Sequence, residues 1–133
     1  KEINDTFGHR GGDRALCGVA RLIVACSRTS DFAARYGGEE FAILLIRADR
    51  ELALSIAERL RTRIDDLILE EDPPLPVDLT ASLGVAFFRE DGDDPKSLMR
   101  SADRALYVAK RRGRNRVVLA SEASEADEDS PAD

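Results

Sequence analysis

Two apolar segments of the chain meet at the stretch Tyr36-Gly37-Gly38-Glu39-Glu40-Phe41. Residues 32–36 lead into its two glycines, and residues 41–46 follow its two acids. Apolar segments joined by so short a polar link predict a β-hairpin. Glycine tolerates positive φ and lets the backbone approach a ligand closely. We therefore expect the two glycines to form the turn of the hairpin and to hold the two acids at its tip.

The paired carboxylates of Glu39 and Glu40 suit a hard divalent cation, typically Mg²⁺ that bridges to the phosphates of a substrate. A solvated turn is the alternative, because a motif of four residues often occurs without any function. Further motifs along the chain are needed to distinguish a metal site from an ordinary turn.

The net charge of the chain arises after Leu119. Residues 120–133 contain six acidic residues and no Lys or Arg, and these six account for the whole net charge of −6. The segment has no hydrophobic period, so we predict a disordered acidic tail over 120–133, with a partner-binding tail as the alternative. The chain has 133 residues, of which 43% are hydrophobic, and this content suits one folded domain over residues 1–119.

Cys17 and Cys26 lie in one predicted helix, too far apart along it for a disulfide and without the spacing of metal ligands. We expect both to be buried free thiols in a reducing cytoplasm. No apolar run approaches the roughly 20 residues of a membrane span, and there is no secretory signal. We therefore expect a cytoplasmic location for this chain, and we leave open whether a longer parent protein is anchored in a membrane.

Hydrophobic periodicity predicts three helices around the hairpin. Residues 1–10 are polar and rich in turn formers, so we expect a connector there. Asp49 and Asp94 are predicted N-caps, the second of them followed by a proline. The first expected helix follows Gly12 and runs to Cys26, the second runs from the cap at Asp49 to about Leu69, and the third runs from the cap at Asp94 to its end at Gly113.

Two further strands are expected in the second half of the chain. Apolar and small or polar residues alternate from Val77 to Phe87, and a short apolar segment runs from Asn115 to Leu119. The order helix, hairpin, helix, strand, helix, strand predicts an α+β fold, with helices packed on a mainly antiparallel sheet.

Eight short motifs occur together and in order along the chain. They are Lys1-Glu2-Ile3-Asn4-Asp5, Gly8-His9, Gly12-Asp13, Arg28-Thr29-Ser30-Asp31, Arg35-Tyr36-Gly37-Gly38-Glu39-Glu40-Phe41, Ser82-Leu83-Gly84-Val85, Ala102-Asp103-Arg104-Ala105-Leu106-Tyr107-Val108-Ala109-Lys110 and Gly113-Arg114-Asn115. This series closely resembles the GGDEF family of diguanylate cyclases, in its Gly-Gly-Glu-Glu-Phe variant. The resemblance covers essentially residues 1–119, and the ordered set is far more specific than any one of its members.

The resemblance implies a fold akin to nucleotide cyclases and polymerase palm domains. It also implies condensation of two GTP molecules into cyclic di-GMP with release of pyrophosphate, in a homodimer where each 3′-hydroxyl attacks the partner's α-phosphorus. Such chemistry calls for carboxylates, cations and positioned backbone amides, with Mg²⁺ or Mn²⁺ as the metal. The expected partners are GTP, cyclic di-GMP and an upstream sensory or regulatory domain.

By match to the family motif, Glu39 is expected to bind the metal, and Glu40 to bind it or to help activate the attacking hydroxyl. The backbone of Gly37 and Gly38 is expected to approach the substrate closely.

Asn4 and Asp13 match the family's guanine-recognising pair, and an amide and a carboxylate suit the hydrogen-bonding edge of guanine. Read alone, Asn4 is a turn residue and Asp13 an acid at a helix start. Lys110 and Arg114 match phosphate-contacting cations, although cations beside a helix C-terminus are favourable without any ligand. The sole histidine, His9, is assigned no catalytic role.

Arg28 and Asp31 match the family's inhibitory product site, because they form an Arg-x-x-Asp at the family's distance from Gly37. An arginine fork pairs with phosphate and an aspartate accepts from guanine, so the pair suits cyclic di-GMP. A surface ion pair is the alternative. Arg59 falls where the family supplies a second arginine from a neighbouring subunit.

In the family, a central strand that carries a metal-binding Asp precedes the segment at Lys1, and the chain lacks this first strand. Either the chain is a fragment of a longer protein, or it is a natural truncation. In both cases we expect weak or absent cyclase activity from the chain alone. The alternative function is a non-catalytic module that binds cyclic di-GMP or GTP. Nucleic-acid binding is not expected, because residues 1–119 are neutral overall and lack aromatic platforms.

Overall fold

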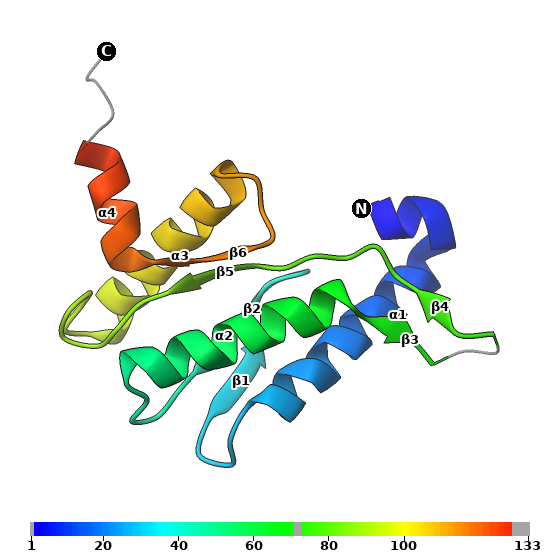
Figure 1. Ribbon diagram of the computed structural model, residues 1–133, viewed down its shortest axis with the longest axis horizontal. Coiled ribbons are helices and arrows are strands. Elements are labelled where there is room, and N and C mark those ends of the chain that lie inside the picture. Colours follow the sequence, from blue (N-terminus) through cyan, green and yellow to red (C-terminus); the bar gives the residue numbers. More distant parts are fainter. Residues whose placement is uncertain (1, 71–72, 129–133) are drawn as a thin grey trace. The chain divides into compact units, whose positions relative to one another are not determined.

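The computed structural model describes residues 2–70 and 73–128, with side chains over 10–70 and 73–125. The chain divides into two compact units, Lys1–Leu79 and Thr80–Asp133. Helices alternate with three two-stranded sheets, β1-β2, β3-β4 and β5-β6 (Figure 1). This mixture of helices and small sheets agrees with the predicted α+β class.

The first unit is built on two helices, α1 (Glu2–Cys26) and α2 (Arg50–Asp65), which pack against each other (Figure 1). Their buried apolar residues recur every three or four positions, which places them on one helix face. These residues are Ala15, Val19, Ile23 and Cys26 in α1 and Ala53, Ile56, Ala57, Leu60 and Ile64 in α2. The predicted hairpin follows α1 as strands β1 (Phe32–Arg35) and β2 (Phe41–Leu44), which pair antiparallel.

Helix α1 begins earlier than the sequence predicted. We expected a connector over residues 1–10, and this was wrong, because the helix starts at Glu2 and continues through Gly11 and Gly12. Each glycine inside a helix costs about 1 kcal/mol relative to alanine, and tertiary packing commonly offsets such a cost. Gly11 is buried, in agreement with that explanation. Neither α1 nor any other helix within the described ranges has the length and apolar composition of a membrane span.

Helix α2 begins as predicted, since the Asp49 carboxylate caps it by accepting from the Leu52 N–H at 2.8 Å. It ends at Asp65, four residues before the predicted end at Leu69. The residues beyond it form a short antiparallel pair, β3 (Ile68–Leu69) with β4 (Leu75–Pro76).

The second unit contains β5 (Ser82–Val85), α3 (Pro95–Arg111), β6 (Arg116–Leu119) and α4 (Ala120–Glu128). Asp94 caps α3 as predicted, with the Ser97 N–H at 2.8 Å from its carboxylate. Strand β5 is shorter than the expected Val77–Phe87, and it pairs with β6 parallel rather than antiparallel. Helix α3 explains the direction, because a helical crossover between two strands returns the chain parallel to its start.

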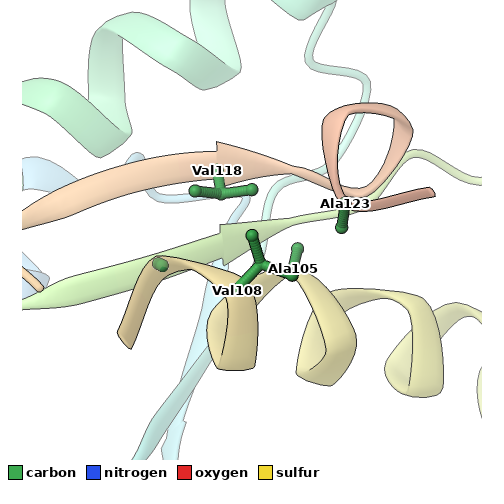
Figure 2. Packing of buried hydrophobic residues seen from close by; sticks show 5 residues of the cluster. Ala105, Val108, Val118 and Ala123 are labelled. Atoms are coloured by element: carbon green, nitrogen blue, oxygen red, sulfur yellow. The ribbon is translucent and has the colours of Figure 1, made fainter. Parts of the chain in front are cut away.

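The core of the second unit lies between α3, β6 and α4. Figure 2 shows Ala105 and Val108 on α3, Val118 on β6 and Ala123 on α4. We expected disorder over 120–133, but residues 120–128 form helix α4, in which Ala123 is fully buried; residues 129–133 lie outside the described part of the chain. The Glu122 carboxylate accepts from the Leu119 N–H at 2.9 Å, which is one half of a capping box. Two buried alanines, Ala120 and Ala123, and one cap are too few to give the sequence a hydrophobic period.

Gly84 allows β5 to approach α3 closely. A Cβ atom at this position would lie 2.2 Å from the Ala102 carbonyl oxygen and 2.4 Å from the Leu106 nitrogen. Both atoms belong to the backbone of α3, so neither can move without shifting the helix.

We therefore expect Gly84→Ala to lower the free energy of unfolding by about 1–3 kcal/mol, through overpacking. Urea unfolding measures the change. Gly37→Ala is the matched control, because its added methyl group would be 3.7 Å from the nearest atom. Equal stability of the two variants would contradict the close approach.

Candidate functional site

The tip of the hairpin is a three-residue loop, Gly37 to Glu39. Tyr36 donates its N–H to the Glu40 carbonyl at 2.7 Å, and the Gly37 N–H donates to the same oxygen at 3.2 Å. We expected Gly37 and Gly38 to form the turn because glycine tolerates positive φ. This reason was wrong, because neither glycine has a positive φ. A Cβ on Gly38 would meet no atom within 4 Å. The space beside Gly38 is therefore open, and its backbone is accessible.

Arg35 binds the backbone of this loop. Its Nε donates to the carbonyl oxygens of Gly37 and Gly38, at 3.1 Å each, and its Nη2 also donates to Gly38 O. Sequence reasoning assigned Arg35 no role beyond membership of the motif. Its partners are main-chain oxygens, which leave no side-chain signature in the sequence.

A groove of about 540 Å³ opens beside the loop. It is lined by Asp13, Leu16, Arg35, Gly38, Glu39 and Glu40. Residues of two separate motifs, Asp13 on one side and Gly38, Glu39 and Glu40 on the other, thus border one space. Glu39 and Asp13 are exposed, and Glu40 is half-buried.

A second, apolar groove adjoins the first, between α1 and the hairpin. Asp13, Leu16 and Arg35 line both grooves. Cys17 lines the apolar groove and is exposed, so the expectation of two buried thiols was wrong, while Cys26 is buried as predicted. The apolar side chain of Val24 at this groove is 70% exposed.

The carboxylates at the loop fit a metal that is completed by substrate. No three His, Cys, Asp or Glu side chains cluster as a metal site within the described residues. Mg²⁺ commonly takes only one or two protein carboxylates and fills its other positions with water and substrate phosphates. Glu39 and Glu40 could supply hard oxygen ligands to such a site. The side chains of Asn4 and His9 lie outside the described residues, and their backbone belongs to α1.

The predicted phosphate-binding cations lie in the second unit. Lys110 is in the last turn of α3, and Arg114 is in the loop that follows. Three successive residues of that loop have positive φ, namely Gly113 (112°), Arg114 (65°) and Asn115 (46°). Positive φ is uncommon outside glycine and tends to occur at functional sites.

Arg28 and Asp31 form a bidentate ion pair. Arg28 Nη2 lies 2.8 Å from Asp31 Oδ1, and Arg28 Nε lies 3.1 Å from Oδ2. The N–H groups of Arg28 and Ile46 also donate to this carboxylate, at 2.8 and 3.1 Å. Each oxygen of Asp31 thus accepts two hydrogen bonds, which fills the four positions of a carboxylate. Arg28 Nη2 also donates to the Ile46 carbonyl at 2.7 Å, so the pair ties residues 28–31 to the segment after β2.

The hydrogen bonds from the Arg28 side chain are the largest cause of the lowered pKa of Asp31, which falls from 3.8 to about 2. The backbone N–H groups of Arg28 and Ile46 lower it further, whereas burial opposes the shift. The carboxylate is fully buried, and the Arg28 side chain is 36% exposed. Arg59 lies near this pair within the same chain, because its Nη2 donates to the Cys26 carbonyl at 3.2 Å.

The lowered pKa makes a prediction for stability against pH. A carboxyl group whose folded-state pKa is depressed stabilises the fold above its unfolded-state value and loses this contribution as pH falls through the folded-state value. We expect Asp31→Asn to lower the urea midpoint most at pH values above 3.8, with the difference from the native chain shrinking between pH 3.8 and about 2. Asp78→Asn, at an exposed carboxylate of the same unit, is the control. A difference that does not change over this window would contradict the assignment.

The sequence is similar to those of known cyclases. The family model described as "Diguanylate cyclase, GGDEF domain" matches residues 1–116. Diguanylate cyclase A of Treponema denticola is 43% identical over 119 residues, which cover 90% of this chain and 32% of that protein. Diguanylate cyclase DosC of Escherichia coli K12 is 44% identical over 119 residues, which cover 90% of this chain and 26% of that protein. The chain therefore spans a third or less of the length of these relatives.

Solved GGDEF domains share the fold. That of YfiN from Pseudomonas aeruginosa has a TM-score of 0.85 at 35% identity, covering 97% of this chain and 75% of that one. That of DgcB from Caulobacter crescentus, solved in complex with cyclic di-GMP, has a TM-score of 0.77 at 35% identity, covering 90% and 71%. An active GGEEF domain of a diguanylate cyclase from Vibrio cholerae has a TM-score of 0.71 at 36% identity, covering 88% and 73%. These likenesses confirm the predicted cyclase-like α+β fold.

Proposed function

Because the chain belongs to the GGDEF family of diguanylate cyclases, we propose that it condenses two GTP molecules into cyclic di-GMP with release of pyrophosphate. The observation that carries the proposal is the groove that joins Asp13 to Gly38, Glu39 and Glu40. Each 3′-hydroxyl oxygen forms a bond to the α-phosphorus of the other GTP as the bond to pyrophosphate breaks. Two copies of the chain must face each other for this reaction, so the active form is a homodimer.

Each side chain at the groove has a role in this reaction. Glu39 binds Mg²⁺ or Mn²⁺, and Glu40 binds the metal or accepts the proton of the attacking hydroxyl. When bound, the metal neutralises charge that develops on the phosphates. Asp13, together with Asn4, accepts and donates hydrogen bonds at the guanine edge. The open space at Gly38 supports close approach of a phosphate to the backbone.

Lys110 and Arg114, the predicted cations of the second unit, contact the phosphates of GTP. Lys110 and Arg114 supply the charge, and the left-handed backbone at Arg114 supports a specialised role for that loop. An upstream sensory or regulatory domain controls when two copies meet, in keeping with relatives of which the matched segment covers only 32% and 26%.

The test is Mg²⁺-dependent conversion of GTP to cyclic di-GMP, measured for this chain and for a version extended upstream of Lys1. We expect the extended version to turn over, this chain to be weak or inactive, and Glu39→Gln to lower turnover about 10²-fold or more through loss of a metal ligand. Glu70→Gln is the matched control, since Glu70 is an exposed acid of the same unit away from the groove. An extended protein whose turnover survives Glu39→Gln would refute the assignment.

Cyclic di-GMP also binds at Arg28 and Asp31, and it inhibits the enzyme from there. The partly exposed guanidinium of Arg28 is available to phosphate or a guanine face, while Asp31 is fully occupied by the chain itself. We therefore assign the direct contact with cyclic di-GMP to Arg28. Asp31 orients the guanidinium of Arg28 for that contact. Arg59 joins the site from this chain or from a neighbouring copy. If no version of the protein turns over GTP, this site supports the alternative function, a cyclic di-GMP-binding module.

We expect Arg28→Ala to weaken cyclic di-GMP binding about tenfold or more, because a charge-assisted contact is lost. Isothermal titration with cyclic di-GMP measures it. Arg28→Lys keeps the charge but not the fork, so it should recover only part of the affinity. Arg63→Ala, at an exposed arginine of α2, is the control. Undiminished binding by a folded Arg28→Ala protein would exclude this site.

A further inference from the structure

Arg35 makes an unusual set of contacts at the tip of the hairpin. One guanidinium group, through Nε and Nη2, donates to the carbonyl oxygens of both Gly37 and Gly38. These hydrogen bonds are charge-assisted, and such bonds are stronger than neutral ones. Arg35 is also the last residue of β1, where it pairs with Phe41, so the strand register fixes its backbone.

These contacts determine where the next residue lies. A peptide group is planar, so fixing the Gly38 carbonyl oxygen also fixes the plane that contains the nitrogen and Cα of Glu39. Glycine has the greatest backbone freedom of any residue, and the loop has two in succession. On the other side of the loop, the Tyr36–Glu40 hydrogen bond fixes Glu40. Arg35 therefore holds the Gly37–Gly38 side of the loop, and the hydrogen bonds to Glu40 stay closed only while that side is held.

We propose that Arg35 is a positioning residue, which holds Glu39 in place for the metal and nucleotide by clamping the two glycine carbonyls. The inference rests on the proposed function for the role of Glu39. It also explains the residue type, since a planar fork with several donors in fixed geometry can reach both carbonyls at once. A lysine ammonium at the same position is a point charge and lacks this fork.

The experiment compares Arg35→Ala, Arg35→Lys and the control Arg21→Ala, at an exposed arginine of α1. Amide hydrogen exchange by NMR reports the order of the loop through the N–H groups of Tyr36 and Gly37. Electron paramagnetic resonance of Mn²⁺ in the presence of GTP reports metal and nucleotide binding. Thermal unfolding shows whether each variant is folded.

We expect Arg35→Ala to speed loop exchange and to weaken Mn²⁺ binding with GTP about tenfold or more, since loss of about 1 Å of positional precision is costly at such sites. Arg35→Lys should fall between it and the native chain, and Arg21→Ala should match the native chain. Added ethylguanidinium should restore both properties to Arg35→Ala, which a merely structural role would not predict.

Unchanged loop exchange in a folded Arg35→Ala protein would overturn the proposal. So would weakened Mn²⁺ binding without faster exchange, because Arg35 would then act on the substrate directly. The exchange measurement needs neither metal nor nucleotide. The Mn²⁺ measurement is therefore made on the version extended upstream of Lys1. If that version binds no Mn²⁺ with GTP, the result counts against the proposed function, while exchange still decides whether Arg35 clamps the loop.

Discussion

Strand β2 is fixed at its two ends by different interactions, and the candidate site depends on both. At its start, the hydrogen bond from the Tyr36 N–H to the Glu40 carbonyl, at 2.7 Å, closes the loop that carries the two acids. Beyond its end, Asp31 accepts from the Ile46 N–H while Arg28 donates to the Ile46 carbonyl. The proposed catalytic loop and the proposed product site are thus attached to one four-residue strand. A shift in the register of β2 would displace both.

Features that depend on neighbouring residues could be predicted from the sequence. The hairpin needs only a short polar link, and Asp49 and Asp94 each cap a helix through an N–H three residues away. Features that depend on distant packing could not. The buried Gly11 lies within a longer helix than its composition suggests, and α4 packs through only two buried alanines, Ala120 and Ala123.

The same distinction applies to the candidate site. The resemblance identified Asp13 and the two acids because each is a side chain in a motif, and the structure places them around one groove. The role of Arg35 could not be predicted from the sequence, because Arg35 binds main-chain oxygens, which no sequence pattern displays. The glycines were recognised for the wrong reason, since neither has a left-handed backbone, and only Gly38 lines the groove and has open space beside it. The motif likewise predicted Asp31 to be a ligand-binding acid, although its carboxylate oxygens accept hydrogen bonds from its own chain.

The hairpin also bears on how self-association of this chain should be interpreted. Among the described residues, β1 and β2 pair only with each other, so each has one edge whose backbone groups have no strand partner. Such edges are templates for pairing with another copy. Phe32 and Leu44 are 65% and 53% exposed, and burying their apolar side chains would stabilise that pairing. Two copies joined edge to edge would appear as a dimer in solution. A dimer seen by size alone is therefore no measure of the face-to-face pair that the reaction requires.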